Sequence, residues 1–378
     1  MTMYENSAIG VVIPAYNEED FIEETIETVP SFVDQVYPVD DASTDGTWEA
    51  MRRASDRVNQ TDSHTFAEPI RHEANSGVGA AIKTGYAKAM EDGLDVIAVM
   101  NGDGQMNPDR LSEIIDPVVS GVAQYAKGNR LHRPQDRIGM PRFRLFGNSL
   151  LTMLTRISSG YWEMTDPQNG YTAISWEVLE MIPYNQLYNR YGFLNDLLAM
   201  LNAYECTIAD VCHPAVYGAE ESGIRYSTFV PSLSWLLLRR FLWRMKTRYV
   251  VSGFHPLVAC YPIGLLSLAI GVFAGVYSIN TFSGSALIGL LSSMTVVLLG
   301  TIFIILGLWF DVQDNRELVI RRIPARKEPR STSPRIGGIE IPVSTSIVHD
   351  GGRYFPGPIQ KRLQTGDETY EDEQGVSQ

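Results

Sequence analysis

The chain has 378 residues, 44% of them hydrophobic, and a formal net charge of −13 at pH 7. This length suits one large domain with appendages. The negative charge argues against a nucleic-acid-binding protein, because such proteins gather basic residues to contact phosphates. The three cysteines are too few and too awkwardly spaced for a disulfide framework or a metal cage. We expect them to be small buried side chains: Cys206, Cys212 and Cys260.

The first hundred residues alternate short apolar runs with amphipathic stretches. We predict strands over 8–16, 33–41 and 95–100, and helices over 18–29, 43–58 and 75–93. This alternation is typical of βαβ units, and the nearly continuous Val and Ile suit a parallel sheet covered on both faces. Ligands of such sheets bind beyond the carboxyl ends of the strands. No G-x-G-x-x-G follows the first strand, which excludes a dinucleotide-dependent oxidoreductase.

Two apolar segments near the C-terminus, 254–279 and 286–310, contain no Lys, Arg, Asp or Glu. Each is longer than the roughly 20 residues that span a bilayer, so we predict a transmembrane hairpin. Basic residues flank both outer ends, which predicts that both ends and the N-terminal domain are cytoplasmic. The N-terminus lacks the basic and apolar regions of a signal segment, in agreement with that placement.

The segment before the hairpin predicts an amphipathic helix. Aromatic and aliphatic residues at helical spacing alternate with basic residues: Trp235, Leu238, Phe241, Leu242 and Met245 with Arg239, Arg240, Arg244, Lys246 and Arg248. Helices of this kind lie on anionic membrane surfaces. The alternative is a helix packed in the core or against a partner, and the apolar segments that follow favour the membrane.

Four motifs occur in order in the N-terminal part: "PAYNE" at 14–18, "VDDASTDGT" at 39–47, "NSGVGAA" at 75–81 and "NGDGQ" at 101–105. Each motif alone is weak, but the ordered set resembles the family 2 glycosyltransferases. The likeness covers about residues 8–230 and is strongest to dolichyl-phosphate mannose synthase and related polyprenyl-phosphate glycosyltransferases. It implies a GT-A-like, Rossmann-type α/β fold with a mostly parallel sheet flanked by helices, followed by the interfacial helix and the hairpin.

The resemblance and the composition together divide the chain into four expected regions. These are a cytoplasmic GT-A domain (1–228), an interfacial helix region (229–252), the two transmembrane helices (253–311) and a cytoplasmic, largely flexible tail (312–378).

For the donor, the resemblance implies a nucleotide-sugar pocket and a Mg²⁺ or Mn²⁺ ion. The expected nucleotide-sugar residues are Pro14, Tyr16, Glu18, Asp41, Asn101 and Asp103, and the expected metal ligands are Asp103 and Gln105. Such ions take oxygen ligands and commonly share them with substrate phosphates. The family often has Asp where this chain has Asn101, so we expect weaker metal binding. Turn formation and helix capping are the alternative roles for Asp40, Asp41 and Asp45, and we favour capping for Asp45 but not for Asp41.

For the acceptor, the resemblance implies that Arg130 and Arg144 hold a lipid phosphate, with Asn148 beside them. Guanidinium groups match phosphate oxygens in a bidentate way that lysine does not. A surface position or a salt bridge is the alternative for either arginine. Arg225, where many relatives have lysine, is a further candidate contact to diphosphate or lipid phosphate. Asp166 is expected to orient the sugar or an arginine, or to act as a weak base, with a structural Asp-Pro turn as the alternative.

We therefore predict an inverting enzyme that transfers one sugar from a UDP- or GDP-sugar to dolichyl or polyprenyl phosphate at the cytoplasmic face of the cell membrane. The expected catalytic residues are Asp103, Arg130, Arg144 and Asp166. A further candidate partner is a second copy of the chain, which would form a homo-oligomer. The alternatives are an enzyme that extends a lipid-linked glycan or polysaccharide, and a non-catalytic scaffold that binds nucleotide sugars.

Overall fold

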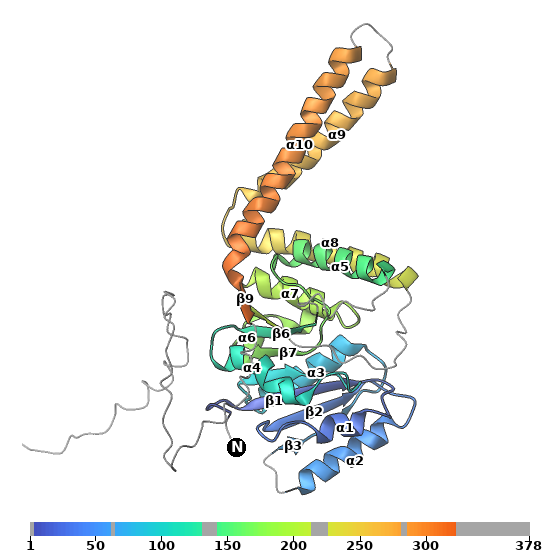
Figure 1. Ribbon diagram of the computed structural model, residues 1–378, viewed down its shortest axis with the longest axis vertical. Coiled ribbons are helices and arrows are strands. Elements are labelled where there is room, and N and C mark those ends of the chain that lie inside the picture. The colour runs from blue at the N-terminus through green and yellow to red at the C-terminus, as the bar shows by residue number, and fades with distance from the viewer. Residues whose placement is uncertain (1–3, 62–64, 131–141, 213–225, 281–285, 323–378) are drawn as a thin grey trace, which may run out of the picture. The chain divides into compact units, whose positions relative to one another are not determined.

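The computed structural model describes residues 4–61, 65–130, 142–212, 226–280 and 286–322 (Figure 1). Within these ranges the strands form one mixed sheet, in the order β3-β2-β1-β5-β7-β6-β8-β9, with β4 also pairing with β2. The strands are β1 Ile9–Ala15, β2 Gln35–Asp40, β3 Phe66–Ala67, β4 Ile70–Arg71, β5 Val96–Val99, β6 Tyr125–Asn129, β7 Thr172–Ser175, β8 Ile208–Cys212 and β9 Val319–Arg322.

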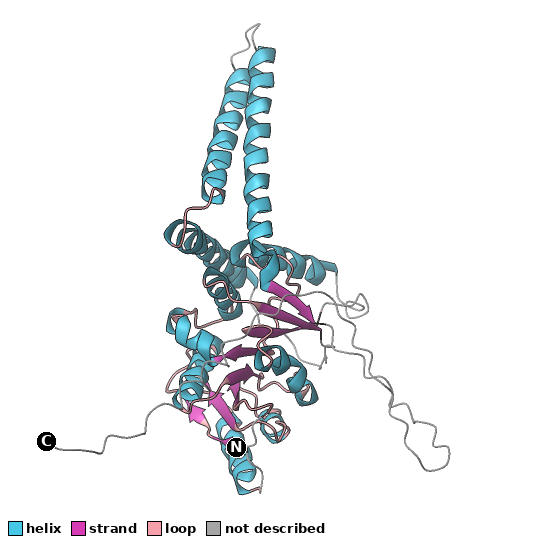
Figure 2. Ribbon diagram, turned by 90° about the vertical axis from the view of Figure 1, so that its left-hand side faces the viewer, coloured by secondary structure: helices cyan, strands magenta, loops and turns pink. Residues whose placement is uncertain are grey.

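Helices cover both faces of the sheet (Figure 2). They are α1 Ile22–Glu27, α2 Thr47–Gln60, α3 Val78–Glu91, α4 Leu111–Val119, α5 Arg142–Ser159, α6 Trp176–Met181, α7 Phe193–Ala203, α8 Tyr226–Lys246, α9 Leu257–Asn280 and α10 Ala286–Asn315. The strands and helices predicted for the first hundred residues are all present. β1 pairs in parallel with β2 and β5, whereas β7 runs antiparallel between β5 and β6. The expected α/β fold with a mostly parallel sheet is thus confirmed.

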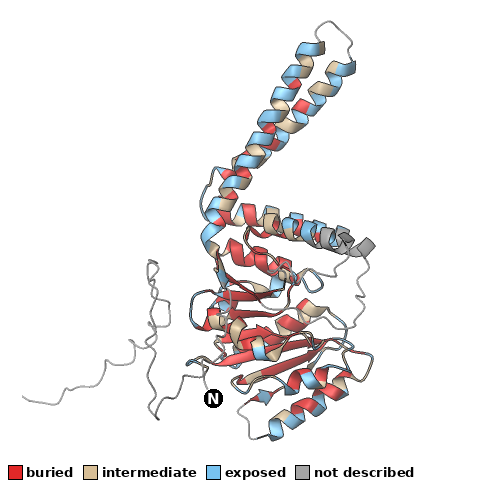
Figure 3. Ribbon diagram, viewed as in Figure 1, coloured by how far each residue is buried: buried red, intermediate tan, exposed pale blue. Residues whose placement is uncertain are grey.

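Side-chain alternation along the strands builds two cores, one on each face of the sheet (Figure 3). In β1, Val12 joins the core beneath α3 and α7, while Val11 and Ile13 join the core beneath α1, α2 and α4. Buried strands with apolar residues on both faces are what a helix-covered sheet requires. All three cysteines are buried and none forms a disulfide, as predicted.

Helices α9 and α10 are long and apolar enough to cross a membrane and pack against each other. Glycines permit the close approach of their backbones. A Cβ atom at Gly264 would lie 2.7 Å from the Ile304 side chain, and one at Gly300 would lie 2.9 Å from the Gly264 carbonyl oxygen. Small residues at such crossings are the usual means of packing helices within lipid.

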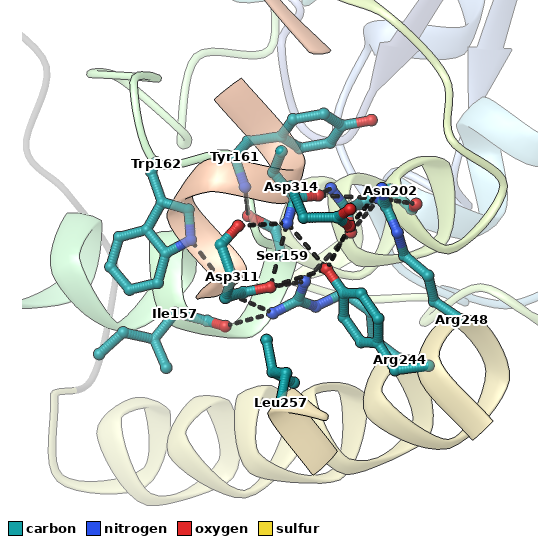
Figure 4. Close-up of polar contacts among 12 residues, drawn as sticks. Ile157, Ser159, Tyr161, Trp162, Asn202, Arg244, Arg248, Leu257, Asp311 and Asp314 are labelled. Atoms are coloured by element: carbon teal, nitrogen blue, oxygen red, sulfur yellow. Dashed lines mark hydrogen bonds and ion pairs between the residues drawn. The ribbon is translucent and has the colours of Figure 1, made fainter. Parts of the chain in front are cut away.

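Helix α10 continues past residue 310, and its last turn carries polar side chains that bind the end of α8 (Figure 4). Asp311 accepts two hydrogen bonds of 2.8 Å from the guanidinium of Arg244, which is fully buried. Arg248, also buried, donates to Asp314 at 3.0 Å. The expectation that these two arginines face a membrane surface is therefore wrong: Arg244 pairs with the buried carboxylate of Asp311, and Arg248 pairs with the partly exposed carboxylate of Asp314.

The predicted apolar face of α8 is only partly exposed, because Met245 is buried and Phe241 packs against it. The helix packs against α5 and α7 through buried Leu233 and Leu237, while Trp235, Leu238 and Leu242 are exposed. Beyond α10, strand β9 pairs in parallel with β8 and completes the sheet. Residues 312–322, which the sequence assigns to a flexible tail, instead complete α10 and form β9.

Gly160, just after α5, is required by its conformation and by its contact with Arg244. Its φ is +78°, and a Cβ atom there would lie 2.3 Å from Nη1 of Arg244. We expect Gly160→Ala to lower the free energy of unfolding by about 2 kcal/mol or more, because backbone strain and a displaced buried guanidinium add together. Thermal unfolding in detergent measures the change.

Gly93→Ala is the matched control for this prediction. Gly93 also has a positive φ, +73°, but nothing lies within 4 Å of a Cβ atom there. It therefore reports the backbone strain alone. Equal losses of stability in the two variants would contradict the role assigned to the contact with Arg244.

Candidate active site

The donor motifs meet at one edge of the sheet because β1, β2 and β5 are parallel and end together. Ala15 lies opposite Asp40 in the register of β1 and β2. Next to them, the Gly102 amide donates to the Pro14 carbonyl at 3.1 Å, and the Asp41 amide donates to the Ala15 carbonyl at 2.9 Å. The structure thus brings together Pro14, Asp41 and the segment 101–105, as the sequence predicts.

Hydrogen bonds join the loop after β1 to the loop after β2. The Asn17 amide donates to Ser43 Oγ at 2.9 Å, and the Thr44 amide donates to Asn17 Oδ1 at 2.9 Å. The Glu18 amide donates to Thr47 Oγ1 at 2.7 Å. These contacts fix the backbone of the loop that carries Tyr16 and Glu18. Tyr16 is 44% exposed.

Asp41 is buried and anchors the segment that leads into α3. Its Oδ2 accepts from the Gly77 amide at 2.7 Å, and its Oδ1 accepts from the Ser76 amide at 2.9 Å. His72 Nδ1 lies 2.8 Å from the same Oδ1 atom. These bonds reach Ser76 and the N-cap residue Gly77 but no amide of the first turn of α3, so Asp41 does not cap the helix, as the sequence predicts. Its nucleotide contact stays a prediction.

Asp45 lies just before Gly46, the N-cap residue of α2, so it supports the start of the helix without being the cap that the sequence favours. Its Oδ1 accepts from both the amide and the hydroxyl of Thr47, at 3.1 and 2.6 Å, at the first residue of α2. A side-chain oxygen here satisfies a backbone donor that the first turn of the helix leaves free.

Asp103 and Gln105 follow β5 and fit a divalent cation. Asp103 Oδ1 accepts from the Gln105 amide at 3.1 Å. Burial raises the pKa of the Asp103 carboxyl, although this hydrogen bond and the nearby charge of Arg130 oppose the shift. A partly desolvated carboxylate gains most from a cation, and an amide oxygen is a suitable second ligand. Within the described ranges no cluster of three or more His, Cys, Asp or Glu side chains is suited to a metal.

Asn101 lies in the same loop, and its side chain packs near Gly170. We expect Asn101→Asp to lower the Mn²⁺ concentration for half-maximal binding by about tenfold, because a second carboxylate strengthens attraction to the ion. Titration calorimetry with the full chain and a non-hydrolysable nucleotide sugar measures it. Asn107→Asp is the control, since the Asn107 side chain accepts from Asp109 outside the motif. An unchanged Mn²⁺ affinity in Asn101→Asp would contradict metal binding at this loop.

On the acceptor side, the structure pairs two residues that the sequence predicts separately. Nε of Arg130 donates to Asp166 Oδ2 at 3.0 Å, and the Arg130 amide donates to the same oxygen at 3.1 Å. Burial raises the pKa of the Asp166 carboxyl, but the positive charges of Arg130 and Lys127 lower it by more. The pKa therefore lies below its ordinary value. The Arg130 side chain is 36% exposed and Asp166 is buried, so the arginine has a face toward solvent.

A buried polar cluster next to this pair could not be predicted from the sequence. Lys127 Nζ donates to the backbone carbonyl of Asp166 and lies 3.9 Å from Asp210 Oδ1. Asp210 Oδ2 accepts from Asn129 Nδ2 at 2.9 Å and from Thr165 Oγ1 at 3.0 Å. The only sequence signal was a charged residue inside an apolar strand, in "YAKGN". The group holds the backbone of residues 165 and 166 against β6 and β8.

The remaining predicted acceptor residues are placed less fully. Arg144 and Asn148 lie on α5, whose backbone is described but whose side chains at these two positions are not. Arg225 lies outside the described residues.

Residues 10–195 match the family model for Glycosyl transferase family 2. The UDP-N-acetylglucosamine--dolichyl-phosphate N-acetylglucosaminyltransferase of Methanococcus voltae is 30% identical over 216 residues, which cover 55% of this chain and 86% of that protein. The chain belongs to glycosyltransferase family 2. An undecaprenyl-phosphate mannosyltransferase of Micrococcus luteus is 28% identical over 191 residues, 49% of this chain and 74% of that relative.

Among solved structures, this family 2 glycosyltransferase is similar to the glucosyl-3-phosphoglycerate synthase of Mycobacterium tuberculosis in complex with phosphoglyceric acid. The identity is 21% and the TM-score 0.45, over 63% of this chain and 80% of the other. The relatives of the chain thus include transferases of sugars to polyprenyl phosphates, and the chain itself is a glycosyltransferase.

Proposed function

We propose that this glycosyltransferase transfers one sugar, with inversion, from a nucleotide-diphosphate sugar to dolichyl or polyprenyl phosphate at the cytoplasmic membrane face. The observation that carries the proposal is the pair formed by Arg130 and buried Asp166, which holds a partly exposed guanidinium at the predicted acceptor site. The charge of Arg130 also opposes the rise in the pKa of Asp103, at the predicted metal loop, which agrees with a donor diphosphate and an acceptor phosphate bound in one site. The names of the relatives in Methanococcus voltae and Micrococcus luteus agree with such an acceptor.

The exposed apolar side chains of α5 and α8 support a lipid acceptor. The two helices pack side by side (Figure 1) and expose Leu150, Met153, Leu154, Trp235, Leu238 and Leu242. A surface of this kind binds the boundary between headgroups and acyl chains. Anchoring by the hairpin and this surface would hold the site near lipid phosphates and raise their local concentration.

The chemistry suits the residues present. A phosphate monoester is already anionic near neutral pH, so it attacks the sugar carbon without a strong base. Arg130, oriented by Asp166, would hold this phosphate in line with the sugar, and positioning supplies much of the rate. A bound Mg²⁺ or Mn²⁺ would neutralise the charge that develops on the departing nucleotide diphosphate.

The test uses the full chain in detergent with a panel of radiolabelled UDP- and GDP-sugars and a short polyprenyl phosphate, in Mg²⁺, Mn²⁺ or EDTA. We expect one donor to give a labelled lipid, and EDTA to abolish the label. Donor hydrolysis without a lipid product would overturn the monophosphate acceptor and favour a lipid-linked glycan. Donor binding without any turnover would favour the non-catalytic scaffold.

A further inference from the structure

Residues 160–166 connect the base of the hairpin with the Arg130–Asp166 pair. The segment begins at Gly160, next to Arg244, and ends at Asp166, which binds Arg130. Arg244 lies on α8 and binds Asp311 of α10, so the segment starts beside a buried polar contact between these two helices and ends inside the predicted acceptor site.

Arg244 fixes the start of the segment. Its Nε donates to the Ser158 carbonyl and its Nη2 to the Ile157 carbonyl, each at 3.0 Å, at the C-terminal end of α5. Its remaining donors bind Asp311 and Asn202 (Figure 4). The guanidinium of Arg244 thus joins α5, α7 and α10. Its positive charge is also favourable at the C-terminal end of α5, which is the negative end of the helix dipole. Helix α5 also carries Arg144 and Asn148.

The middle of the segment is bound to the residues that follow the hairpin. Trp162 Nε1 donates to Asp311 Oδ2 at 3.1 Å, and Arg321 of β9 donates to the Glu163 carbonyl at 2.8 Å. A cavity of about 230 Å³ lies beside this contact, lined by Trp162, Glu163 and the segment 312–316 of α10 and its following turn. With a cavity there, hydrogen bonds contribute more than close packing to fixing the segment.

From these contacts we propose that Trp162 and Asp311 are positioning residues for the acceptor-phosphate site, because the base of α10 fixes the segment that presents Asp166 to Arg130. The inference rests on the proposed function only for the identity of the acceptor. The membrane hairpin is then more than an anchor, since its base sets the position of the arginine that holds the lipid phosphate.

Hydrogen–deuterium exchange on the full chain in detergent tests the positioning directly. The Arg130 amide donates to Asp166, so its exchange rate reports whether that pair is held. We expect Trp162→Phe to speed exchange in the peptide that contains Arg130 by about tenfold, since the loss of one hydrogen bond to a charged group loosens the segment. Peptides from α2 should exchange as in the unchanged protein.

A control variant and a second test variant complete the experiment. Trp309→Phe is the matched control: Trp309 is on α10 and 53% exposed, and its substitution should leave the Arg130 peptide unchanged. Arg321→Gln removes the half-exposed contact to Glu163 without touching the buried network, and we expect the same acceleration, to a smaller degree. An unchanged Arg130 peptide in both Trp162→Phe and Arg321→Gln would overturn the proposal.

Kinetics separates positioning from general damage. We expect Trp162→Phe to raise KM for polyprenyl phosphate about fivefold and to leave KM for the nucleotide sugar unchanged. Faster exchange with an unchanged acceptor KM would overturn the link to the acceptor. If the unchanged protein transferred no sugar to polyprenyl phosphate, the proposed function would fail, while the exchange experiment would still decide whether α10 positions Arg130.

Discussion

Asp103→Ala is expected to lower kcat for sugar transfer by about a thousandfold, which corresponds to roughly 4 kcal/mol of lost transition-state stabilisation. Asp103 carries the one carboxylate in the loop at 101–105, because Asn101 and Gln105 are neutral. Removing it leaves amide oxygens alone to bind a cation, which then neutralises the leaving diphosphate poorly. Steady-state kinetics at saturating Mn²⁺ measures the loss.

Asp109→Ala is the control for Asp103→Ala, because Asp109 is exposed and lies six residues further along the same segment. We expect it to keep near-normal kcat. Thermal unfolding of both variants should show folded protein, since Asp103 makes its hydrogen bonds within its own loop, to Gln105 and Asn101. A kcat for Asp103→Ala close to that of Asp109→Ala would contradict the assignment of the metal site.

Arg130→Lys is expected to lower kcat/KM for the polyprenyl phosphate by about a hundredfold, with little loss of stability. Lysine keeps the positive charge beside Asp166 but loses the planar fork that holds Asp166 and a phosphate at once. The kinetic loss should appear against the acceptor and not in KM for the nucleotide sugar. Varying each substrate separately at saturation of the other measures this difference.

Arg130→Ala should lower stability as well as activity, since it removes the positive charge that compensates for the burial of the Asp166 carboxylate. In the unchanged protein the lowered pKa of Asp166 contributes stability above the carboxyl's unfolded pKa, and this stability is lost as the pH falls through the folded pKa. The alanine variant should lose most of that contribution at neutral pH. Arg53→Ala, which breaks an exposed pair with Glu23, is the control with little effect. Equal acceptor kinetics in Arg130→Lys and Arg53→Ala would contradict the acceptor role.

Much of the donor side could be predicted from the sequence because its signals are local. The apolar runs that form β1, β2 and β5 end at polar and glycine residues, and parallel strands necessarily bring those ends to one edge. The pairing of Arg130 with Asp166 needed the fold, since 36 residues separate them. The role of Lys127 was hidden because a lysine in a short strand reads as a surface residue.

The base of the hairpin could not be predicted for a similar reason. Arg244 lies among other basic residues at helical spacing, a pattern typical of a membrane surface. Its partner Asp311 is 67 residues away, at the end of an apolar segment whose helix continues further than hydropathy indicates. Hydropathy places the end of a span where charges begin, but here the charges lie within the helix and pair with α8.

The most direct test of the central claim is the mass of the lipid product. The full chain is incubated with the donor that gives transfer, with a short polyprenyl monophosphate or the matching polyprenyl diphosphate glycan as acceptor, and the lipids are analysed by mass spectrometry. We predict a single species, the polyprenyl monophosphate plus one sugar residue, which is absent with Asp103→Ala. Addition of sugar to the diphosphate glycan alone, or of several sugars in succession, would contradict the account.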